Sequence, residues 1–291
     1  MSAFLELDHV TKTFGGTGMF GGGSVTVAVD DVSLSIDEDE SSITTVAGES
    51  GSGKTTLARL LLGSHVPNAG KMLYRGKDFT RLTRRERRNF RREIQPIFQD
   101  PFESYNPFYK VDHVLDEPIK NFRLASSTSE KKQMIEDALE MVGLVPEETL
   151  GRFPHQLSGG QRQRVMVARA LLLKPRVILA DEPVSMVDAS LRATILDSIR
   201  RLNRDLGISV IYITHDLTTA YQISDNIMVM YRGTVVEAGT VDAVIPDPQH
   251  PYTKLLIESI PQPDPKNRWG SEPPQQNWDT SDLQIAGCRF A

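Results

Sequence analysis

The sequence predicts an α/β nucleotide-binding fold, and three observations lead to that prediction. A β-branched strand over residues 42–47 runs directly into a glycine-rich loop and then into an apolar helix over residues 55–62. Further along the chain, predicted strands and helices alternate. Three chemistry-bearing motifs each follow a predicted strand, and ligands of open α/β sheets bind where the strands end.

Short strands are expected before the glycine-rich loop. Residues 4–7, 25–29 and 34–36 are apolar or β-branched, which favours extended structure. Glycines gather in residues 15–23, and this segment is predicted to be a turn between strands.

The middle of the chain, from about residue 98 to residue 154, is predicted to be a mostly helical insertion in the α/β part. Apolar residues recur at helical spacing over residues 129–142, which predicts an amphipathic helix. Pro101, Pro107 and Pro118 are expected to lie in loops.

The alternation of strands and helices then resumes. Helices are predicted over residues 160–173, 189–206 and 217–224, and strands over residues 176–180, 209–214, 226–231 and 234–238. From residue 261 onward the chain is rich in Pro, Gln and Asp without periodicity, so a loop or tail is expected there.

Composition excludes several classes of protein. The chain has 291 residues and a net charge of −5, whereas a protein that binds nucleic acid along its whole length is usually basic. Its single cysteine, Cys288, excludes an internal disulfide framework and a self-contained zinc or iron–sulfur site. The first ten residues do not read as a signal peptide. A helix that crosses a bilayer needs about 20 apolar residues, and no apolar stretch of the sequence is that long. If the protein acts at a membrane, we expect it to bind there peripherally.

Residues 48–56 read GESGSGKTT and match the pattern G-x-x-x-x-G-K-[ST]. Glycines let backbone N–H groups approach a phosphate closely. Lys54 would place its charge on the β- and γ-phosphates, and the Thr55 hydroxyl would reach Mg²⁺. The alternative is a turn that merely caps the following helix.

Two carboxylates, Asp181 and Glu182, end the predicted strand VILA. Asp-Glu-Pro after a strand is ordinarily a turn. Beside a phosphate loop, however, Asp181 would hold Mg²⁺ and Glu182 would orient and activate the attacking water. His215 follows the strand VIYIT and is either structural or a contact of the γ-phosphate.

Residues 157–161 read LSGGQ. Ser158 at a helix N-cap, followed by two glycines, makes a second anion site, with a bare helix cap as the alternative. In this order and spacing the motifs resemble those of the ATP-binding subunit of ABC transporters, over about residues 3–260. The resemblance implies the P-loop NTPase ABC ATPase fold, an α/β RecA-like core with an antiparallel β subdomain and an inserted α-helical subdomain. The expected domains are residues 1–260, with the helical subdomain at about 98–165, and a loop-rich extension over residues 261–291.

The resemblance also implies roles for single residues. Ser158 and Gly160 would serve the ATP of a second subunit, because two subunits sandwich each nucleotide in this family. Gln99 in IFQDP matches a glutamine that senses Mg²⁺ and the attacking water. Asp188 matches an aspartate that crosses the dimer interface, although the usual Ser-Ala-Leu-Asp reads SMVD here. Phe14 would stack on adenine, with a packed strand phenylalanine as the alternative.

The expected cofactors are ATP and Mg²⁺. The expected catalytic residues are Glu182, His215, Lys54 and Gln99. The expected Mg²⁺ ligands are Thr55, Gln99 and Asp181. The expected nucleotide-binding residues are Phe14, Gly48, Glu49, Ser50, Gly51, Ser52, Gly53, Lys54, Thr55, Thr56, Ser158, Gly159, Gly160, Gln161 and Asp188.

The segment HPYTKLLIESIP, residues 250–261, resembles the C-terminal extension of the oligopeptide, dipeptide and nickel importer group. IFQDPFESYNP resembles the second of that group's two paired ATPases. The resemblance implies as partners a second, different ATPase subunit, two transmembrane permease subunits and, indirectly, an extracytoplasmic substrate-binding protein, with no nucleic acid. It also implies a peripheral position on the cytoplasmic face of the inner membrane. With Cys288 alone, the iron–sulfur cluster of some relatives is not expected.

Import of oligopeptides or dipeptides, powered by ATP hydrolysis, is therefore the predicted function. An oligosaccharide or nickel importer, a non-transport ABC ATPase and a regulatory module that holds ATP without turnover are the alternatives. The sequence has no duplicated cassette or long coiled-coil insertion of the non-transport type, and Glu182 and His215 argue against a regulatory module. Residues 81–92 contain seven arginines, which indicate a solvated helix face or a contact with anionic lipid.

Overall fold

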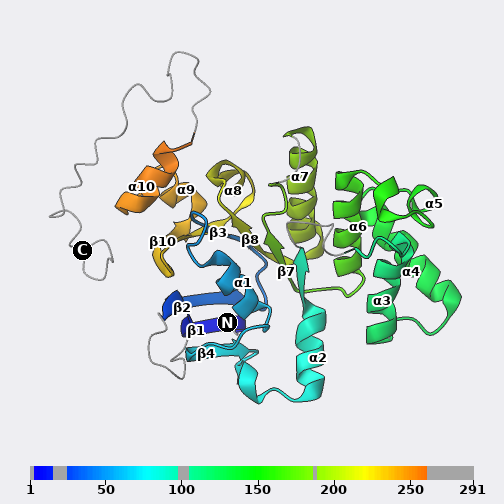
Figure 1. Cartoon of the computed structure of the whole chain (residues 1–291), viewed down its shortest axis with the longest axis horizontal. Helices are drawn as coiled ribbons and strands as arrows, with labels where there is room; N and C mark the ends of the chain where they lie inside the picture. Colours follow the sequence, from blue (N-terminus) through cyan, green and yellow to red (C-terminus); the bar gives the residue numbers. More distant parts are fainter. Residues whose placement is uncertain (1–2, 16–24, 98–104, 186–188, 261–291) are drawn as a thin grey trace, which may run out of the picture.

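The computed structural model describes residues 3–15, 25–97, 105–185 and 189–260. Two β-sheets enclose helix α1 (Lys54–Leu61), and a group of helices stands beside the larger sheet (Figure 1). This arrangement confirms the predicted α/β fold class. Within the described residues, no helix is both long and apolar enough to pass through a bilayer.

The smaller sheet is antiparallel, in the order β2-β1-β4-β5. Its strands are β1 (Ala3–Phe14), β2 (Thr26–Asp37), β4 (Ala69–Tyr74) and β5 (Lys77–Asp78). Residues 25–29 and 34–36 were expected as separate strands, but both fall in or beside the single long strand β2. The pairing of β1 with β2 shifts register, and His9 and Asp31 adopt φ values of 49° and 52° near these shifts. Their side chains lie 2.7 Å apart. Polar residues at these register shifts interrupt the alternation of apolar and polar residues, so the sequence does not show that β1 and β2 form one continuous strand pair.

The larger sheet contains β3, β7 and β8, the strands that lead into the phosphate loop, the Asp181–Glu182 pair and His215. Its order is β10-β9-β3-β8-β7-β6, with β10 antiparallel to β9 and the other pairings parallel. The strands are β3 (Ile43–Ala47), β6 (Ile94–Ile97), β7 (Val177–Asp181), β8 (Ser209–Thr214), β9 (Asn226–Tyr231) and β10 (Thr234–Thr240). Because β3, β8 and β7 are neighbours and parallel, their carboxyl ends meet at one edge.

A helical lobe packs beside this sheet. It consists of α3 (Val111–Phe122), α4 (Thr128–Met141), the single turn α5 (Pro146–Thr149) and α6 (Gly159–Leu171). The predicted helical insertion is therefore present, but the expectation that Pro118 lies in a loop is wrong. Pro118 is inside α3 and buried, on the same apolar face as Leu115 and Ile119. Burial of that face outweighs the hydrogen bond that proline cannot make.

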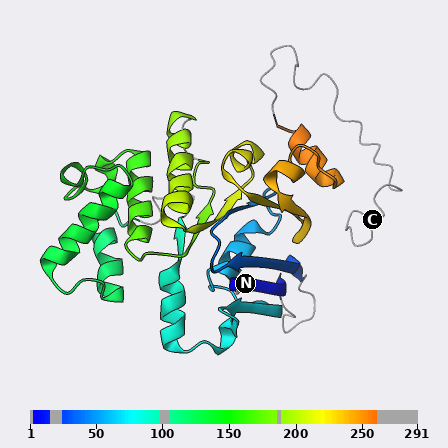
Figure 2. The same cartoon turned by 180° about the vertical axis from the view of Figure 1, so that it is seen from behind.

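The remaining helices complete the layers around the larger sheet. They are α2 (Arg84–Glu93), α7 (Ala189–Leu206), α8 (Leu217–Ile223), α9 (Val241–Val244) and α10 (Pro251–Glu258). Figures 1 and 2 both place the helical lobe and the C-terminal helices α9 and α10 at opposite ends of the molecule.

Three apolar clusters hold these layers together. The first joins the helical lobe and α7 to one face of the larger sheet. The second lies between the two sheets, where Leu57, Leu60 and Leu61 of α1 are fully buried. The third packs α8, α9 and α10 against β3 and β9. The phosphate loop lies between the second and third clusters. The helix that follows the loop, α1, packs in the second cluster, and Ala47, the last residue of the strand before it, packs in the third.

Candidate nucleotide-binding site

The phosphate loop connects β3 to α1, and two of its glycines have no room for a side chain. Gly48 has a φ of +151°, and a Cβ there would lie 2.3 Å from the carbonyl oxygen of Met230 on β9. Gly53 has a φ of +106°, and a Cβ there would lie 2.2 Å from the carbonyl oxygen of Ala28 on β2. The loop is thus seated between backbones of both sheets, and only glycine fits at these two positions.

The side chain of Lys54, the first residue of α1, turns back into the phosphate loop. Its Nζ donates hydrogen bonds to the carbonyl oxygens of Gly48 and Glu49, both at 2.7 Å. Burial lowers the pKa of Lys54, while the nearby Glu182, Asp181 and Glu49 act in the opposite direction. The loop therefore holds a poorly hydrated cation next to the carboxylates of β7.

The other expected residues of the loop divide between its exposed and buried sides. Glu49, Ser50, Gly51 and Thr55 are exposed, whereas Ser52 is buried and its carbonyl accepts a hydrogen bond from the Gly233 N–H at 2.9 Å. Thr56 is half-buried in the first turn of α1. The exposed side presents the loop backbone and the Thr55 hydroxyl to a ligand.

Asp181 and Glu182 lie at the carboxyl end of β7. Burial raises the pKa of Asp181, and the charge of Glu182 adds to this increase, whereas Lys54 opposes it. Glu182 has a φ of +44° and donates its N–H to the carbonyl of Ile213 on β8 at 2.9 Å. This strained backbone position directs two adjacent carboxylates to the same sheet edge.

His215 follows β8, the strand between β3 and β7. Its Nδ1 lies 2.9 Å from Oε1 of Glu182. The His215 side chain is 59% exposed and that of Glu182 is 19% exposed, so the imidazole stands on the open side of the pair. The carboxyl edge thus gathers Lys54, Asp181, Glu182 and His215, as expected from the strand order.

The LSGGQ motif starts α6 in the helical lobe. The Ser158 hydroxyl accepts a hydrogen bond from the Gln161 N–H at 3.2 Å, and the Gln161 Oε1 accepts one from the Ser158 N–H at 2.9 Å. Ser158 and Gly159 are exposed, while Gly160 is buried. In Figures 1 and 2, β7 and α7 stand between α6 and α1. The motif therefore lies apart from this chain's own phosphate loop.

Phe14, Gln99 and Asp188 are the remaining expected residues. Phe14 ends β1, is 39% exposed and contacts the His65 ring edge-on at 5.5 Å between centroids. Gln99 and Asp188 lie outside the described residues. Pro101 and Cys288 are also outside them.

Sequence reasoning gave no role to Tyr252. This residue is in α10, and its hydroxyl accepts a hydrogen bond from the Glu49 N–H of the phosphate loop at 3.0 Å. The two residues are 203 positions apart, so no local pattern could have paired them.

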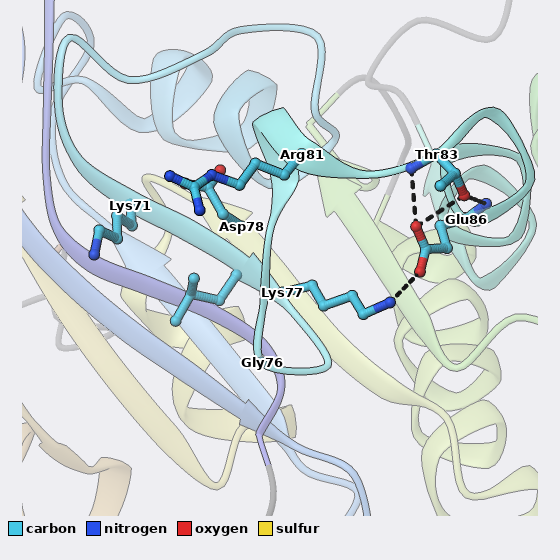
Figure 3. A pocket seen from close by; sticks show the side chains of 8 residues that line it. Lys71, Gly76, Lys77, Asp78, Arg81, Thr83 and Glu86 are labelled. Carbon is cyan, nitrogen blue, oxygen red and sulfur yellow. Dashed lines mark hydrogen bonds and ion pairs between the residues drawn. The ribbon is translucent and has the colours of Figure 1, made fainter.

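The arginine-rich segment forms α2 and borders a separate cavity of about 540 Å³ (Figure 3). Glu86 accepts hydrogen bonds from Lys77 at 2.5 Å and from Thr83, and these interactions lower the pKa of Glu86 to about 2. Thr83 and Glu86 form a capping box that starts α2. This cavity is lined by β4, β5 and α2 and contains no residue of the phosphate loop.

A second cavity, of about 520 Å³, opens between α3, α6 and the segment that precedes α3. Tyr109 and His113 stack at its wall with ring centroids 4.4 Å apart. Arg169 also lines it, and within the described part of the chain this guanidinium has no hydrogen bond or ion pair. Burial lowers the pKa of Arg169. We refer to this cavity as the Arg169 groove.

Comparisons with known proteins show the family of this chain. The chain matches the family described as ABC transporter over residues 29–185 and the family described as oligopeptide/dipeptide transporter, C-terminal region, over residues 236–291. It is 42% identical over 238 residues to the oligopeptide transport ATP-binding protein OppF of Salmonella typhimurium, covering 82% of this chain and 70% of that protein. It is 41% identical over 253 residues to the dipeptide transport ATP-binding protein DppF of Escherichia coli, covering 86% of this chain and 74% of that protein.

Two solved structures are similar to this chain in fold. One is the ATP-binding cassette MJ0796, solved as a dimer in a post-hydrolysis state with ADP and Pi, with a TM-score of 0.69 and 30% identity over 81% of this chain and 98% of that one. The other is cbiO1 of Clostridium perfringens, part of the ABC transporter complex cbiONQ, with a TM-score of 0.72 and 25% identity over 85% of this chain and 92% of that one.

Proposed function

The chain belongs to the ABC transporter family of ATPases, and we propose that it powers the import of oligopeptides or dipeptides. The observation that carries the proposal is the shared sheet edge at which Lys54, Asp181, Glu182 and His215 meet. The match of residues 236–291 to the C-terminal region of oligopeptide and dipeptide transporters supports a peptide as the cargo.

The residues of the sheet edge suit phosphoryl transfer, which depends on positioning and charge neutralisation. Lys54 leaves the carbonyls of Gly48 and Glu49 to bind the β- and γ-phosphates of ATP. Glu182 orients and activates the attacking water. His215 contacts the γ-phosphate, and its hydrogen bond to Glu182 holds both side chains on the open side of the edge. By its family resemblance, Gln99 takes part in sensing the same water.

The side chains of this edge fit a divalent cation. Mg²⁺ prefers oxygen ligands and retains several waters when it binds a nucleotide. The Thr55 hydroxyl and the Asp181 carboxylate supply such oxygens, and a cation would relieve the burial and like-charge repulsion that raise the pKa of Asp181. Gln99 is a third proposed ligand. When bound, Mg²⁺ would neutralise charge on the phosphates.

The second half of each ATP site comes from another ATPase subunit. The start of α6 lies apart from this chain's own phosphate loop, and its residues Ser158, Gly159, Gly160 and Gln161 suit contact with a partner's nucleotide. Asp188 is proposed to cross the same interface, and Phe14 to stack on adenine from the end of β1. The dimer of the related cassette MJ0796 supports this arrangement. We propose a different chain as the partner subunit.

The Arg169 groove suits a segment of a transmembrane permease subunit. Tyr109, which lines the groove, is 50% exposed, and Phe108, the residue before it in the chain, is 86% exposed. The Arg169 guanidinium is half-buried and has no counter-ion among the described residues, so it favours a carboxylate from the incoming chain, since an unpaired buried charge is costly. Such docking would hold the ATPase at the cytoplasmic face of the membrane, with an extracytoplasmic binding protein on the other side. We also propose residues 1–260 as the ATPase domain, with residues 98–165 as its helical subdomain, and residues 261–291 as an extension.

Transport in proteoliposomes tests this function. The chain is reconstituted with its partner ATPase, permease subunits and binding protein, and uptake of labelled di- and oligopeptides is compared with uptake of oligosaccharides and nickel. ATP-dependent uptake of peptides is expected. ATP-dependent uptake of only an oligosaccharide or nickel would overturn the proposed cargo.

The groove has its own test. Arg169→Ala is expected to lower recovery of the chain with the permease subunits at least about tenfold, because it removes a charged hydrogen-bonding partner. Arg200→Ala, an exposed arginine of α7, is the matched control and should assemble normally. Unchanged assembly of Arg169→Ala would contradict docking at this groove.

A further inference from the structure

The start of α10 is fixed by contacts with β10. Glu237 of β10 accepts hydrogen bonds from the N–H groups of Gln249, at 2.8 Å, and His250, at 3.0 Å. The His250 imidazole then accepts a hydrogen bond from the Tyr252 N–H at 3.1 Å and so caps the helix. Pro251 occupies the first turn, where its missing N–H has no consequence. Together, these contacts determine where Tyr252 lies.

Tyr252 faces inward from this anchored helix. It is only 4% exposed and packs in the apolar cluster that also contains Ala47, the last residue of β3 before the phosphate loop. Its ring lies against that of Tyr231, with centroids 4.4 Å apart. The hydroxyl at the tip of the ring reaches the loop and accepts the Glu49 N–H at 3.0 Å.

The Glu49 residue is therefore held through both of its backbone polar groups. Its N–H bonds to Tyr252, and its carbonyl accepts a hydrogen bond from Lys54 at 2.7 Å. Gly48, directly before it, is pressed against the backbone of Met230. When Lys54 turns to the phosphates of ATP, its hydrogen bond to the Glu49 carbonyl is lost, and that carbonyl keeps only the Ser52 N–H, at 3.2 Å. The hydrogen bond from the Glu49 N–H to Tyr252 does not depend on Lys54.

We propose that Tyr252 is a positioning residue of the ATPase, whose hydroxyl holds the Glu49 peptide so that the phosphate loop keeps its ATP-receiving shape. The C-terminal HPYT segment thereby sets nucleotide affinity, although it lies outside the phosphate loop, the Asp-Glu pair and LSGGQ. The inference rests on the ATP-binding role of the loop and does not depend on the transported cargo.

The ring and the hydroxyl of Tyr252 have separable effects. The ring fills the apolar cluster and contributes to folding, which phenylalanine would do equally well. The hydroxyl is the group that reaches the loop. Tyr252→Phe therefore removes the proposed function while keeping the packing, and Tyr221→Phe, an exposed tyrosine of α8, is the matched control.

The first experiment measures the binding of the non-hydrolysable analogue AMP-PNP with Mg²⁺ to the full chain by calorimetry. Tyr252→Phe is expected to weaken binding about three- to tenfold, as for one lost hydrogen bond. Tyr221→Phe should bind like the wild type. Affinity within twofold of the wild type for Tyr252→Phe would overturn the proposal.

The second experiment measures hydrogen exchange at the Glu49 amide in the nucleotide-free chain. Tyr252→Phe should accelerate this exchange at least about tenfold, because the amide loses its acceptor. Its melting temperature should remain within about 2 °C of the wild type. Unchanged exchange at Glu49, or a loss of affinity that accompanies melting of the whole chain, would mean that Tyr252 acts only through packing.

In the assembled transporter, we expect the substitution to change KM for ATP but not kcat. Tyr252→Phe should raise KM for ATP about three- to tenfold and leave kcat within twofold of the wild type. A lower kcat with unchanged KM would contradict a role in positioning the loop. Failure of peptide uptake with normal AMP-PNP affinities would instead count against the proposed cargo alone.

Discussion

The imidazole of His215 and the carboxylate of Glu182 are hydrogen-bonded across two adjacent strands, with 2.9 Å between Nδ1 and Oε1. Glu182 follows β7 and His215 follows β8, so the parallel pairing of these strands brings the two side chains together. The contact places side by side the carboxylate that we propose to orient water and the imidazole that we propose to contact the γ-phosphate.

His215→Ala is expected to lower kcat for ATP hydrolysis about 10²-fold, because a donor aimed at developing phosphate charge is lost. Steady-state phosphate release by the assembled transporter measures this. His9→Ala, an exposed histidine of the smaller sheet, is the control and should hydrolyse ATP normally. Equal rates for His215→Ala and His9→Ala would exclude a direct role for His215.

Gly53→Ala is expected to destabilise the chain by at least about 3 kcal/mol, because a left-handed φ and a clash with the Ala28 backbone act together. Gly51→Ala is the matched control: Gly51 has a φ of +83° but nothing within 4 Å of an added Cβ. It should lose only about 1–2 kcal/mol. Urea unfolding without nucleotide compares the two, and equal losses would contradict the close seating of the loop against β2.

Ser158→Ala is expected to lower the free energy of unfolding by about 1 kcal/mol, since it removes half of the capping box of α6. Urea unfolding of the full chain measures this. Ser198→Ala, at a half-buried position in the middle of α7, removes no helix cap and should not destabilise the chain. A Ser158→Ala variant as stable as the wild type would show that the cap does not contribute to the free energy of unfolding.

Acidification should loosen the C-terminal helix. Burial lowers the pKa of His250 from its usual value of 6.5, although Glu237 acts in the opposite direction. The unfolded chain therefore binds more protons at this group, and its stabilising contribution falls as pH drops below about 6.5 towards the lower folded pKa. Protonation also removes the His250 nitrogen that accepts the Tyr252 N–H at the start of α10.

His250→Asn keeps a capping oxygen but cannot titrate in this range. We expect the melting temperature of the wild type to fall more steeply than that of His250→Asn between pH 7 and pH 5. Parallel curves for the two proteins would contradict this role of His250.

Much of the nucleotide site could be predicted because its signals are local. The glycine pattern of residues 48–56 and the carboxylates after a buried strand each occupy one short segment, and parallel strand order then brings them to one edge. The helices over residues 129–142 and 189–206 also have a clear apolar period, and the structure contains both.

Other features depend on contacts between distant segments. β6 is only four residues long and contains Pro96, so it has no strand pattern of its own and forms by pairing with β7. Pro118 is tolerated in α3 because its helix face is buried. The hydrogen bond between Tyr252 and Glu49 connects segments that only the folded chain brings together, and Arg169 becomes notable only because no described side chain pairs with it.

ATP hydrolysis by the assembled transporter carrying Glu182→Gln shows whether Glu182 is the base that activates the attacking water. The amide keeps the shape of the carboxylate but cannot act as a base, so turnover should fall at least about 10²-fold. Binding of ATP should persist, with the nucleotide trapped in a stable dimer of ATPase subunits. Hydrolysis by Glu182→Gln at the wild-type rate, or equally negligible hydrolysis by both proteins with the permease subunits present, would contradict the account.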